Sequence, residues 1–191
     1  MIASSYNANI DYGTLLSAIT FLSLYKDVDK DVSLPKKIVE FGILEGYSLL
    51  KFAETSSPDC IIEAFDIFDN FNGHHANQSA ILDKFANYPN VKIRYGDFYK
   101  KFEDLADNSI DILHVDIANN GDIYEYVFKN YMCKLTQTGI LILEGGSRER
   151  DNVEWMDKYS KPKMQPVLEK YADHFNIKTL GTVPSLTIIY K

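Results

Sequence analysis

A glycine-bearing run followed by an acid is the first place where residue types suit a small ligand. Gly42 and Gly46 lie four residues apart between a β-rich and a helical stretch, where a Cβ would obstruct a positive φ or a ligand's close approach. Ser48 follows, and its hydroxyl can cap the coming helix or hydrogen-bond a ligand carboxylate. Asp66 stands twenty residues after Gly46, at the spacing where a carboxylate meets the two hydroxyls of a ribose. A tight turn and an exposed acid explain each feature alone, but together they favour a nucleoside-containing cofactor.

The spacing of the two glycines discriminates among such cofactors. A dinucleotide fingerprint needs three glycines as G-x-G-x-x-G, whereas Gly42 and Gly46 form G-x-x-x-G, which disfavours NAD without excluding it. A P-loop is excluded because no G-K-[ST] follows the turn. S-adenosylmethionine is the nucleoside cofactor that remains.

A second group of polar residues lies further along the chain and consists of His114, Asp116, Asn119, Asn120 and Glu144. Two carboxylates with carboxamides nearby could hold Mg²⁺, which prefers oxygen ligands and would polarise a substrate hydroxyl. The alternative is that Asp116 or Asn119 only caps a helix that starts near Gly121. His114 would leave its strand on the same face as Asp116, as a general base or as a hydrogen-bonded structural residue.

Short β-rich runs and helical stretches alternate around both groups. The strands are expected at 37–41, 61–65, 91–95, 110–115, 139–143, 177–180 and 186–190. Helices are expected at 11–26, 47–54, 78–88, 122–135 and 165–175. This alternation predicts an α/β fold, a Rossmann-like doubly wound, mainly parallel seven-stranded sheet with helices on both faces. The last two strands are too close for a helical crossover, so they should form an antiparallel C-terminal pair.

The predicted topology brings the polar residues to one edge of the sheet. Ligands of doubly wound sheets bind outside the carboxyl ends of the strands. Acids stand at five consecutive strand ends: Glu40, Asp66, Asp97, Asp116 and Glu144. Asp116 and Glu144 should end neighbouring strands about 5 Å apart. We therefore expect a ligand crevice outlined by carboxylates.

Composition narrows the class of protein. The 191 residues carry a net charge of −7, which argues against nonspecific binding to nucleic acid or an anionic membrane surface. The length predicts one domain over residues 1–191, with 1–34 as a helical segment packed on it. Cys60 and Cys133 have no metal-ligand spacing and are interpreted as buried thiols in a reducing compartment. Without a signal or membrane-spanning run, the cytoplasm is the expected location.

The motifs resemble a known family. Glu40-Phe41-Gly42, Gly46 and Tyr47-Ser48 resemble the first motif of class I S-adenosylmethionine-dependent O-methyltransferases of the catechol and caffeoyl-CoA type. Residues 64–69, 113–116 and Tyr124-Glu125 are similar to the macrocin O-methyltransferase group. The resemblance covers roughly residues 37–146, more than half of the chain.

The resemblance implies roles for individual residues. Glu40 and Gly42 would line the methionine end of the cofactor, Asp66 would take the ribose hydroxyls, and Asp97 would neighbour the adenine amino group. The cofactor-binding set is thus Glu40, Gly42, Gly46, Ser48, Asp66 and Asp97. Asp116 and Glu144 would be metal ligands, but the families commonly continue with Asp-Asn or Asp-Asp. This chain has Glu144-Gly145-Gly146, which removes one ligand.

These features predict an S-adenosylmethionine-dependent methyltransferase acting on a hydroxyl of a small molecule, with a sugar-like acceptor among the candidates. Asp116 or His114 would remove or orient the hydroxyl proton. Because Glu144-Gly145 departs from the family pattern, an alternative stays open: the protein could be catalytically degenerate and bind the cofactor without methyl transfer. The oligomeric state is open, a homodimer included.

The charged stretch 145–163 is long for a connection and holds the only tryptophan, Trp155. It could be a lid or substrate wall, or a solvated helix that Trp155 anchors to the core. As a wall, its Arg148 and Arg150 would suit an anionic or hydroxyl-rich acceptor.

Overall fold

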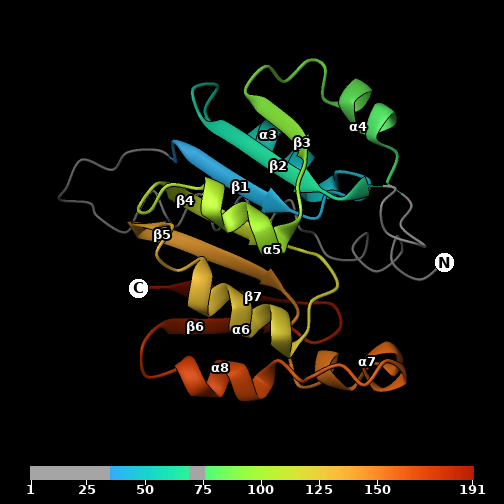
Figure 1. The fold of residues 1–191 in the computed structure, drawn as a ribbon, viewed down its shortest axis with the longest axis vertical. Coiled ribbons are helices and arrows are strands. Elements are labelled where there is room, and N and C mark those ends of the chain that lie inside the picture. Colours follow the sequence, from blue (N-terminus) through green and yellow to red (C-terminus); the bar gives the residue numbers. More distant parts are fainter. Residues whose placement is uncertain (1–34, 69–75) are drawn as a thin grey trace. The chain divides into compact units, whose positions relative to one another are not determined.

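The structure is a computed structural model that describes residues 35–68 and 76–191 (Figure 1). The chain divides into two compact units, one ending at Asp104 and one spanning Leu105–Lys191, and each is described by itself. The single domain expected over 1–191 stays a prediction. The helix expected at 11–26 and the packed segment 1–34 lie outside the described residues.

The first unit contains a parallel three-stranded arrangement in the order β3-β2-β1. Its strands are β1 (Lys37–Phe41), β2 (Ile61–Asp66) and β3 (Val91–Tyr95). Its helices are α3 (Tyr47–Thr55), α4 (Gln78–Lys84), α5 (Phe98–Lys101) and the 3₁₀ turn η2 (Phe102–Asp104).

Aromatic side chains fill the core of the first unit near the carboxyl ends of its strands. The Phe41 ring stacks on Phe65 at 5.3 Å between centroids and meets Phe98 edge-on at 5.4 Å. All three side chains are buried. Because these rings come from β1, β2 and the start of α5, they hold the three strand-end turns in fixed positions.

The second unit combines parallel and antiparallel pairing. Its strands are β4 (Ile110–Val115), β5 (Leu135–Glu144), β6 (Asn176–Gly181) and β7 (Ser185–Tyr190). β4 runs parallel to β5, while β7 pairs antiparallel with both β5 and β6. The expected antiparallel C-terminal pair is thus confirmed.

Helices of the second unit are α6 (Gly121–Asn130), the 3₁₀ turn η3 (Arg150–Asn152), α7 (Glu154–Lys158) and α8 (Gln165–Tyr171). α6 and α8 lie side by side (Figure 1), and their contact includes Phe128 stacked on Tyr171 at 4.1 Å between centroids.

Seven strands are present in the described residues, at the expected places, but three helices end earlier than their patterns indicate. α4 ends at Lys84, and the chain then turns, with the Tyr88 N–H donating to the Phe85 carbonyl. Pro89 disfavours a helical Tyr88, so the helix does not resume there. α6 ends at Asn130, since Leu135 begins β5 opposite Ile110 rather than closing the helix. α8 ends at Tyr171.

Only one of the two cysteines is buried as expected. Cys60 is buried just before β2, but Cys133 is exposed because it lies in the turn after α6. The interpretation of Cys133 as a buried thiol is therefore wrong.

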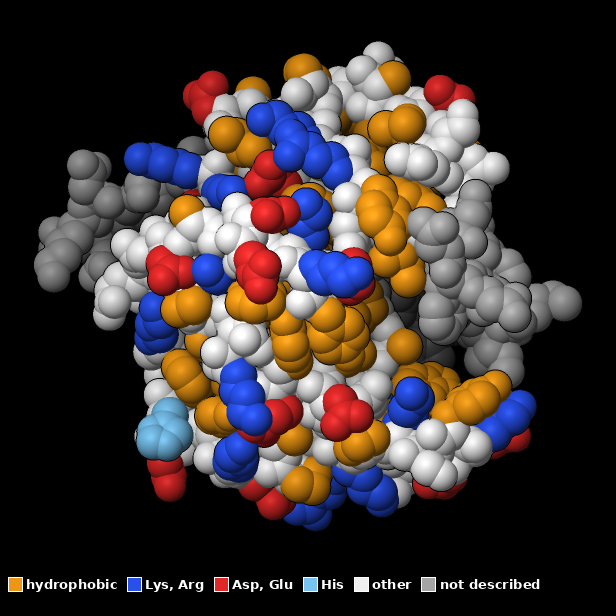
Figure 2. Space-filling view, in the orientation of Figure 1, with side chains coloured by type: hydrophobic (Ala, Val, Ile, Leu, Met, Phe, Trp, Pro, Cys, Tyr) orange, Lys and Arg blue, Asp and Glu red, His pale blue; other side chains and the backbone are white. Residues whose placement is uncertain are grey.

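Charged side chains of both signs are interleaved on the face shown in Figure 2. Glu63 contacts Lys37 at 2.8 Å and Arg94 at 3.6 Å, and Glu125 contacts Lys129 at 3.1 Å. Within the ranges that the structure describes, no helix has the length and apolar character needed to cross a membrane.

Candidate functional site

The turn from β1 to α3 is built from backbone conformations that favour glycine. Gly42 has φ 90°, Gly46 has φ 70°, and Leu44 between them has φ 47°, a strained value for a leucine. A Cβ on Gly46 would lie 2.7 Å from a ring carbon of Phe85. Both glycines singled out in the sequence are therefore needed by the turn itself.

Asp66 fastens this turn to the end of β2. One carboxylate oxygen accepts hydrogen bonds from the backbone N–H groups of Ile43 at 2.7 Å and Leu44 at 3.3 Å. The other accepts from the N–H of Phe68 at 2.7 Å. The acid is only 4% exposed. Sequence reasoning placed Asp66 beside the glycine turn but missed that it organises the turn through amide hydrogen bonds.

Glu40 and Ser48 form a buried pair at the same turn. The Ser48 hydroxyl donates to a carboxylate oxygen of Glu40, which is 0% exposed. α3 has Gly46 at its N-cap and no side-chain capping bond, so the alternative that Ser48 caps the helix is wrong. Instead, Ser48 reaches back to the end of β1.

Asp97 lies at the end of β3, where its carboxylate caps α5. It accepts from the Tyr99 N–H at 2.9 Å and lies 3.6 Å from the Lys100 ammonium. Its side chain is one-third exposed. Because β1, β2 and β3 are parallel neighbours, Glu40, Asp66 and Asp97 share one edge of this sheet. The structure thus brings the expected cofactor-binding residues of the first unit together.

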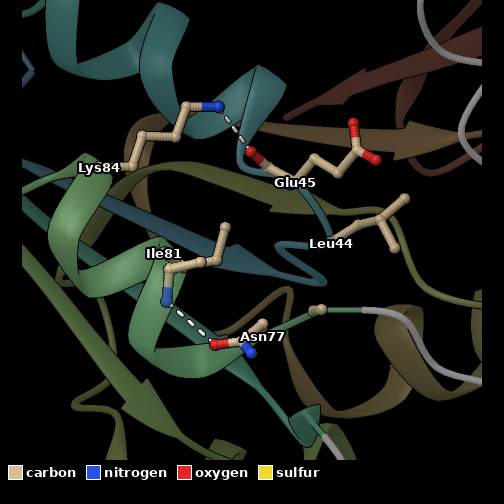
Figure 3. Close-up of a pocket in the computed structure, with 7 residues that line it drawn as sticks. Leu44, Glu45, Asn77, Ile81 and Lys84 are labelled. Carbon is tan, nitrogen blue, oxygen red and sulfur yellow. Dashed lines mark hydrogen bonds between the residues drawn. The ribbon is translucent and has the colours of Figure 1, made fainter.

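A cavity of about 240 Å³ lies between the glycine turn and α4 (Figure 3). It is lined by Leu44, Glu45, Ala76, Asn77, Ala80, Ile81 and Lys84. The Lys84 ammonium donates to the Glu45 carbonyl at 2.6 Å, as the close-up shows. The lining is mainly apolar and includes none of the six residues expected to bind the cofactor, so the sequence motifs did not point to it.

In the second unit, β4 and β5 place the other predicted residues at their carboxyl ends. Val115 pairs with Leu143, which sets Asp116 and Glu144 beside each other at the two strand ends, as expected. His114 is 0% exposed and Glu144 is 3% exposed. Asp116 is half-buried.

The two asparagines have structural roles in this unit. The Asn119 amide donates to the carbonyls of Val115 at 2.8 Å and Glu144 at 2.9 Å, which ties the two strand ends together. Asn120 is the N-cap of α6 and accepts from the Asp122 N–H at 2.9 Å. The capping role considered for Asp116 or Asn119 therefore belongs to Asn120.

Glu144 forms a buried ion pair with Arg150, a partner that sequence reasoning did not assign. The guanidinium donates through Nε to one carboxylate oxygen at 2.7 Å and through Nη2 to the other at 3.1 Å. Burial and, to a smaller extent, the neighbouring Asp116 raise the pKa of Glu144 to about 7, although Arg150 acts to lower it. No periodic pattern signals a pair six residues apart across a non-helical turn.

The donor set does not fit the Mg²⁺ expected at Asp116 and Glu144. Both carboxylate oxygens of Glu144 are engaged by a guanidinium, and the Asn119 oxygen accepts from the Ile117 N–H at 3.3 Å. Within residues 35–68 and 76–191, no cluster of three or more His, Cys, Asp or Glu side chains could hold a metal ion.

The first part of the stretch 145–163 packs against the second unit through several buried side chains, whereas residues 157–163 are exposed. Asp151 is 2% exposed and accepts from the N–H groups of Met164 at 2.7 Å and Gln165 at 2.8 Å. Met156 is buried, whereas Trp155 is only half-buried, so Met156 supplies the anchor that had been expected of Trp155. Arg148 is exposed and Arg150 is buried, which removes Arg150 as an acceptor ligand.

Comparison with known proteins agrees with this arrangement. A family model described as a methyltransferase domain matches residues 39–144. No curated protein sequence matches the chain. A solved methyltransferase from Geobacter sulfurreducens is 17% identical, with a TM-score of 0.62 over 94% of this chain and 77% of that one.

Two further solved structures contain S-adenosylmethionine. TomG from Streptomyces achromogenes, an O-methyltransferase involved in tomaymycin synthesis, is 17% identical, with a TM-score of 0.66 over 93% of this chain and 78% of its own. Fibrillarin from Aeropyrum pernix is 17% identical, with a TM-score of 0.60 over 92% of this chain and 74% of its own. At these identities the likeness concerns the fold, and it confirms the predicted Rossmann-like, mainly parallel seven-stranded class.

Proposed function

Since the chain belongs to the family of methyltransferase domains, we propose that it transfers a methyl group from S-adenosylmethionine to a hydroxyl of a small molecule. The observation that carries this proposal is the turn after β1, where Asp66 binds the turn amides and acids end β1, β2 and β3. The O-methyltransferase TomG, of similar fold, supports the choice of oxygen as acceptor. The cytoplasm, a sugar-like acceptor and a homodimer are sequence-based expectations.

The residues at this turn fit the cofactor chemically. A carboxylate accepts hydrogen bonds only, which suits ribose hydroxyls at Asp66, an exocyclic amine at Asp97 and an ammonium at Glu40. The positive φ values of Gly42 and Gly46 let the backbone turn sharply where a ligand approaches. Ser48 orients Glu40 through its hydroxyl.

Methyl transfer needs an electrophile, an aligned hydroxyl and a proton acceptor. When bound, S-adenosylmethionine supplies a methyl group on a positively charged sulfur. Asp116 is half-buried at the end of β4 and His114 is fully buried within it, so Asp116 is the better placed to accept the hydroxyl proton. His114 would act behind it by orienting the carboxylate.

One observation favours the second candidate, a cofactor-binding protein without methyl transfer. Arg150 engages both oxygens of Glu144, so this acid is not available to hold a metal ion that would polarise a substrate hydroxyl. In that case the first unit would bind S-adenosylmethionine while the second unit contributes no chemistry.

Titration calorimetry with S-adenosylmethionine, its demethylated product and NAD tests the cofactor. We expect both methionine-derived ligands to bind; binding of NAD alone would refute the proposal. Release of the demethylated product is then measured with a panel of phenolic and sugar-like hydroxyl compounds. Turnover that Asp116→Asn reduces at unchanged cofactor affinity supports the base assignment, and binding without turnover across the panel favours the second candidate.

A further inference from the structure

Arg150 is held at the ends of β4 and β5 as a fixed positive charge. Its side chain is 5% exposed and that of Glu144 is 4% exposed, and their two hydrogen bonds form a bidentate pair. The guanidinium carbon also lies 5.3 Å from the centre of the Trp155 ring. A planar guanidinium suits both contacts, because it matches a carboxylate edge-on and an aromatic ring face-on.

The backbone around Arg150 positions it for this contact. Gly145 and Gly146 have φ values of 94° and 99°, so the chain reverses immediately after Glu144. The Arg150 N–H donates to the Ser147 hydroxyl at 3.0 Å. A Cβ on Gly145 would lie 3.5 Å from Cγ of Arg150, so the arginine stem packs against this glycine. The ion pair is therefore built into the turn.

The carboxylates at the ends of β4 and β5 explain why a positive charge is favourable at this site. Asp116 and Glu144 end neighbouring parallel strands, and the charge of Asp116 helps to raise the pKa of Glu144. A positive charge paired with Glu144 offsets the repulsion from Asp116 and the loss of solvation on burial. The guanidinium supplies that charge from within the chain.

We propose that Arg150 takes the place of a divalent cation at the ends of β4 and β5, so that this site binds no metal and methyl transfer proceeds without one. The part of the proposal that concerns methyl transfer rests on the proposed function. The part that concerns metal binding does not, because it follows from the Glu144–Arg150 contact alone. Loss of the guanidinium would leave both oxygens of Glu144 without that partner at the strand end next to Asp116, and these oxygen ligands would then attract a hard cation.

Manganese binding, measured by electron paramagnetic resonance on the full chain, tests this substitution. The wild type should leave millimolar Mn²⁺ in its aqueous form. Arg150→Met keeps an apolar stem beside Trp155 but removes the charge, and it should bind Mn²⁺ at least about tenfold more tightly than the wild type. Arg148→Met removes an exposed arginine two residues away and should behave as the wild type. The double variant Glu144→Gln with Arg150→Met should lose the acquired binding.

Micromolar Mn²⁺ binding by the wild type, or a folded Arg150→Met variant that binds no more tightly, overturns the proposal. If circular dichroism shows that Arg150→Met does not fold, the wild-type titration decides, with Arg150→Lys as the charge-preserving variant that should stay metal-free. Once an acceptor is known, turnover should agree within about twofold with and without EDTA; loss in EDTA and rescue by Mg²⁺ would overturn the proposal. A wild type that binds no Mn²⁺ and transfers no methyl group refutes the proposed function but supports the substitution.

Discussion

The glycine turn after β1 and the Glu144–Arg150 pair at the end of β5 hold buried carboxylates in different ways. Asp66 is bound by three backbone N–H groups, whereas Glu144 is bound by a charged side chain. Backbone donors are dipoles fixed by the path of the chain, whereas a guanidinium carries a full charge on a side chain. The stability of the first arrangement therefore depends on backbone conformation, and the stability of the second depends on charge balance.

Removal of the charge in the second arrangement should have the largest effect on stability. Arg150→Met leaves Glu144 buried beside Asp116, which we expect to reduce the free energy of unfolding by about 3–5 kcal/mol at neutral pH. Urea denaturation measures this loss. Glu144→Leu combined with Arg150→Met should recover most of it; a single variant within about 1 kcal/mol of the wild type would show that charge balance is unimportant here.

The loss of stability in the Arg150→Met variant should depend on pH. Burial raises the pKa of Glu144 above its ordinary value, and removal of Arg150 takes away the main influence that lowers it. Below pH 4.5 the carboxyl binds a proton in both states, and above it the unfolded chain loses that proton first, so stability falls as pH rises through the folded pKa. The destabilisation by Arg150→Met should therefore be smaller at pH 5 than at pH 8. Equal destabilisation at both pH values would contradict the charge-based explanation.

At the glycine turn, backbone conformation should determine how much stability a substitution costs. Gly46→Ala forces a Cβ into a left-handed position and against the Phe85 ring, so we expect a loss of about 2–3 kcal/mol that does not change with pH. Thermal unfolding at two pH values measures both the size and the constancy of the effect. A loss of stability that changed with pH would show that charge also contributes at the glycine turn, which contradicts the distinction between the two arrangements.

Asn119 and Asn120, which follow β4, form a matched pair for substitution. Asn119→Ala leaves the carbonyls of Val115 and Glu144 without their amide donor in a buried place, with an expected loss of about 2 kcal/mol. Asn120→Ala removes only the cap of α6 and should cost about 1 kcal/mol. Chemical denaturation of both variants side by side tests this order. The reverse order would mean that the helix, and not the tie between β4 and β5, limits the stability of the second unit.

The losses of cofactor affinity on substitution of Asp66 and Asp97 should follow the number of backbone hydrogen bonds that each carboxylate accepts. Asp66→Asn weakens the acceptor that holds Ile43, Leu44 and Phe68, and we expect affinity for S-adenosylmethionine to fall by about tenfold. Asp97 caps only the short α5 and is one-third exposed, so Asp97→Asn should lower affinity by about threefold. Calorimetry on both variants provides the comparison. Equal losses would indicate that direct ligand contact, rather than support of the turn, governs binding.

The two arrangements also differ in how far the sequence predicts them. The glycines, Asp66 and Asp97 follow apolar runs with strand periodicity, and a parallel sheet brings the ends of such runs to one edge. Asp116 and Glu144 were placed beside each other by the same reasoning, and the register of β4 and β5 confirms it. The pairing of Arg150 with Glu144 is not predictable in this way, because it depends on a turn at Gly145 and Gly146 that has no periodic signature.

Local patterns thus determined the strands, the order of strands and helices along the chain, and the acids at the strand ends, since those properties depend on neighbours in the sequence. Tertiary packing decided what each polar group contacts. Ser48 binds Glu40, Asp66 binds the turn, Asn119 joins two strands, and Glu144 pairs with Arg150. A buried hydrogen-bonding group takes the partner that folding brings within reach, and distance along the chain does not specify that partner.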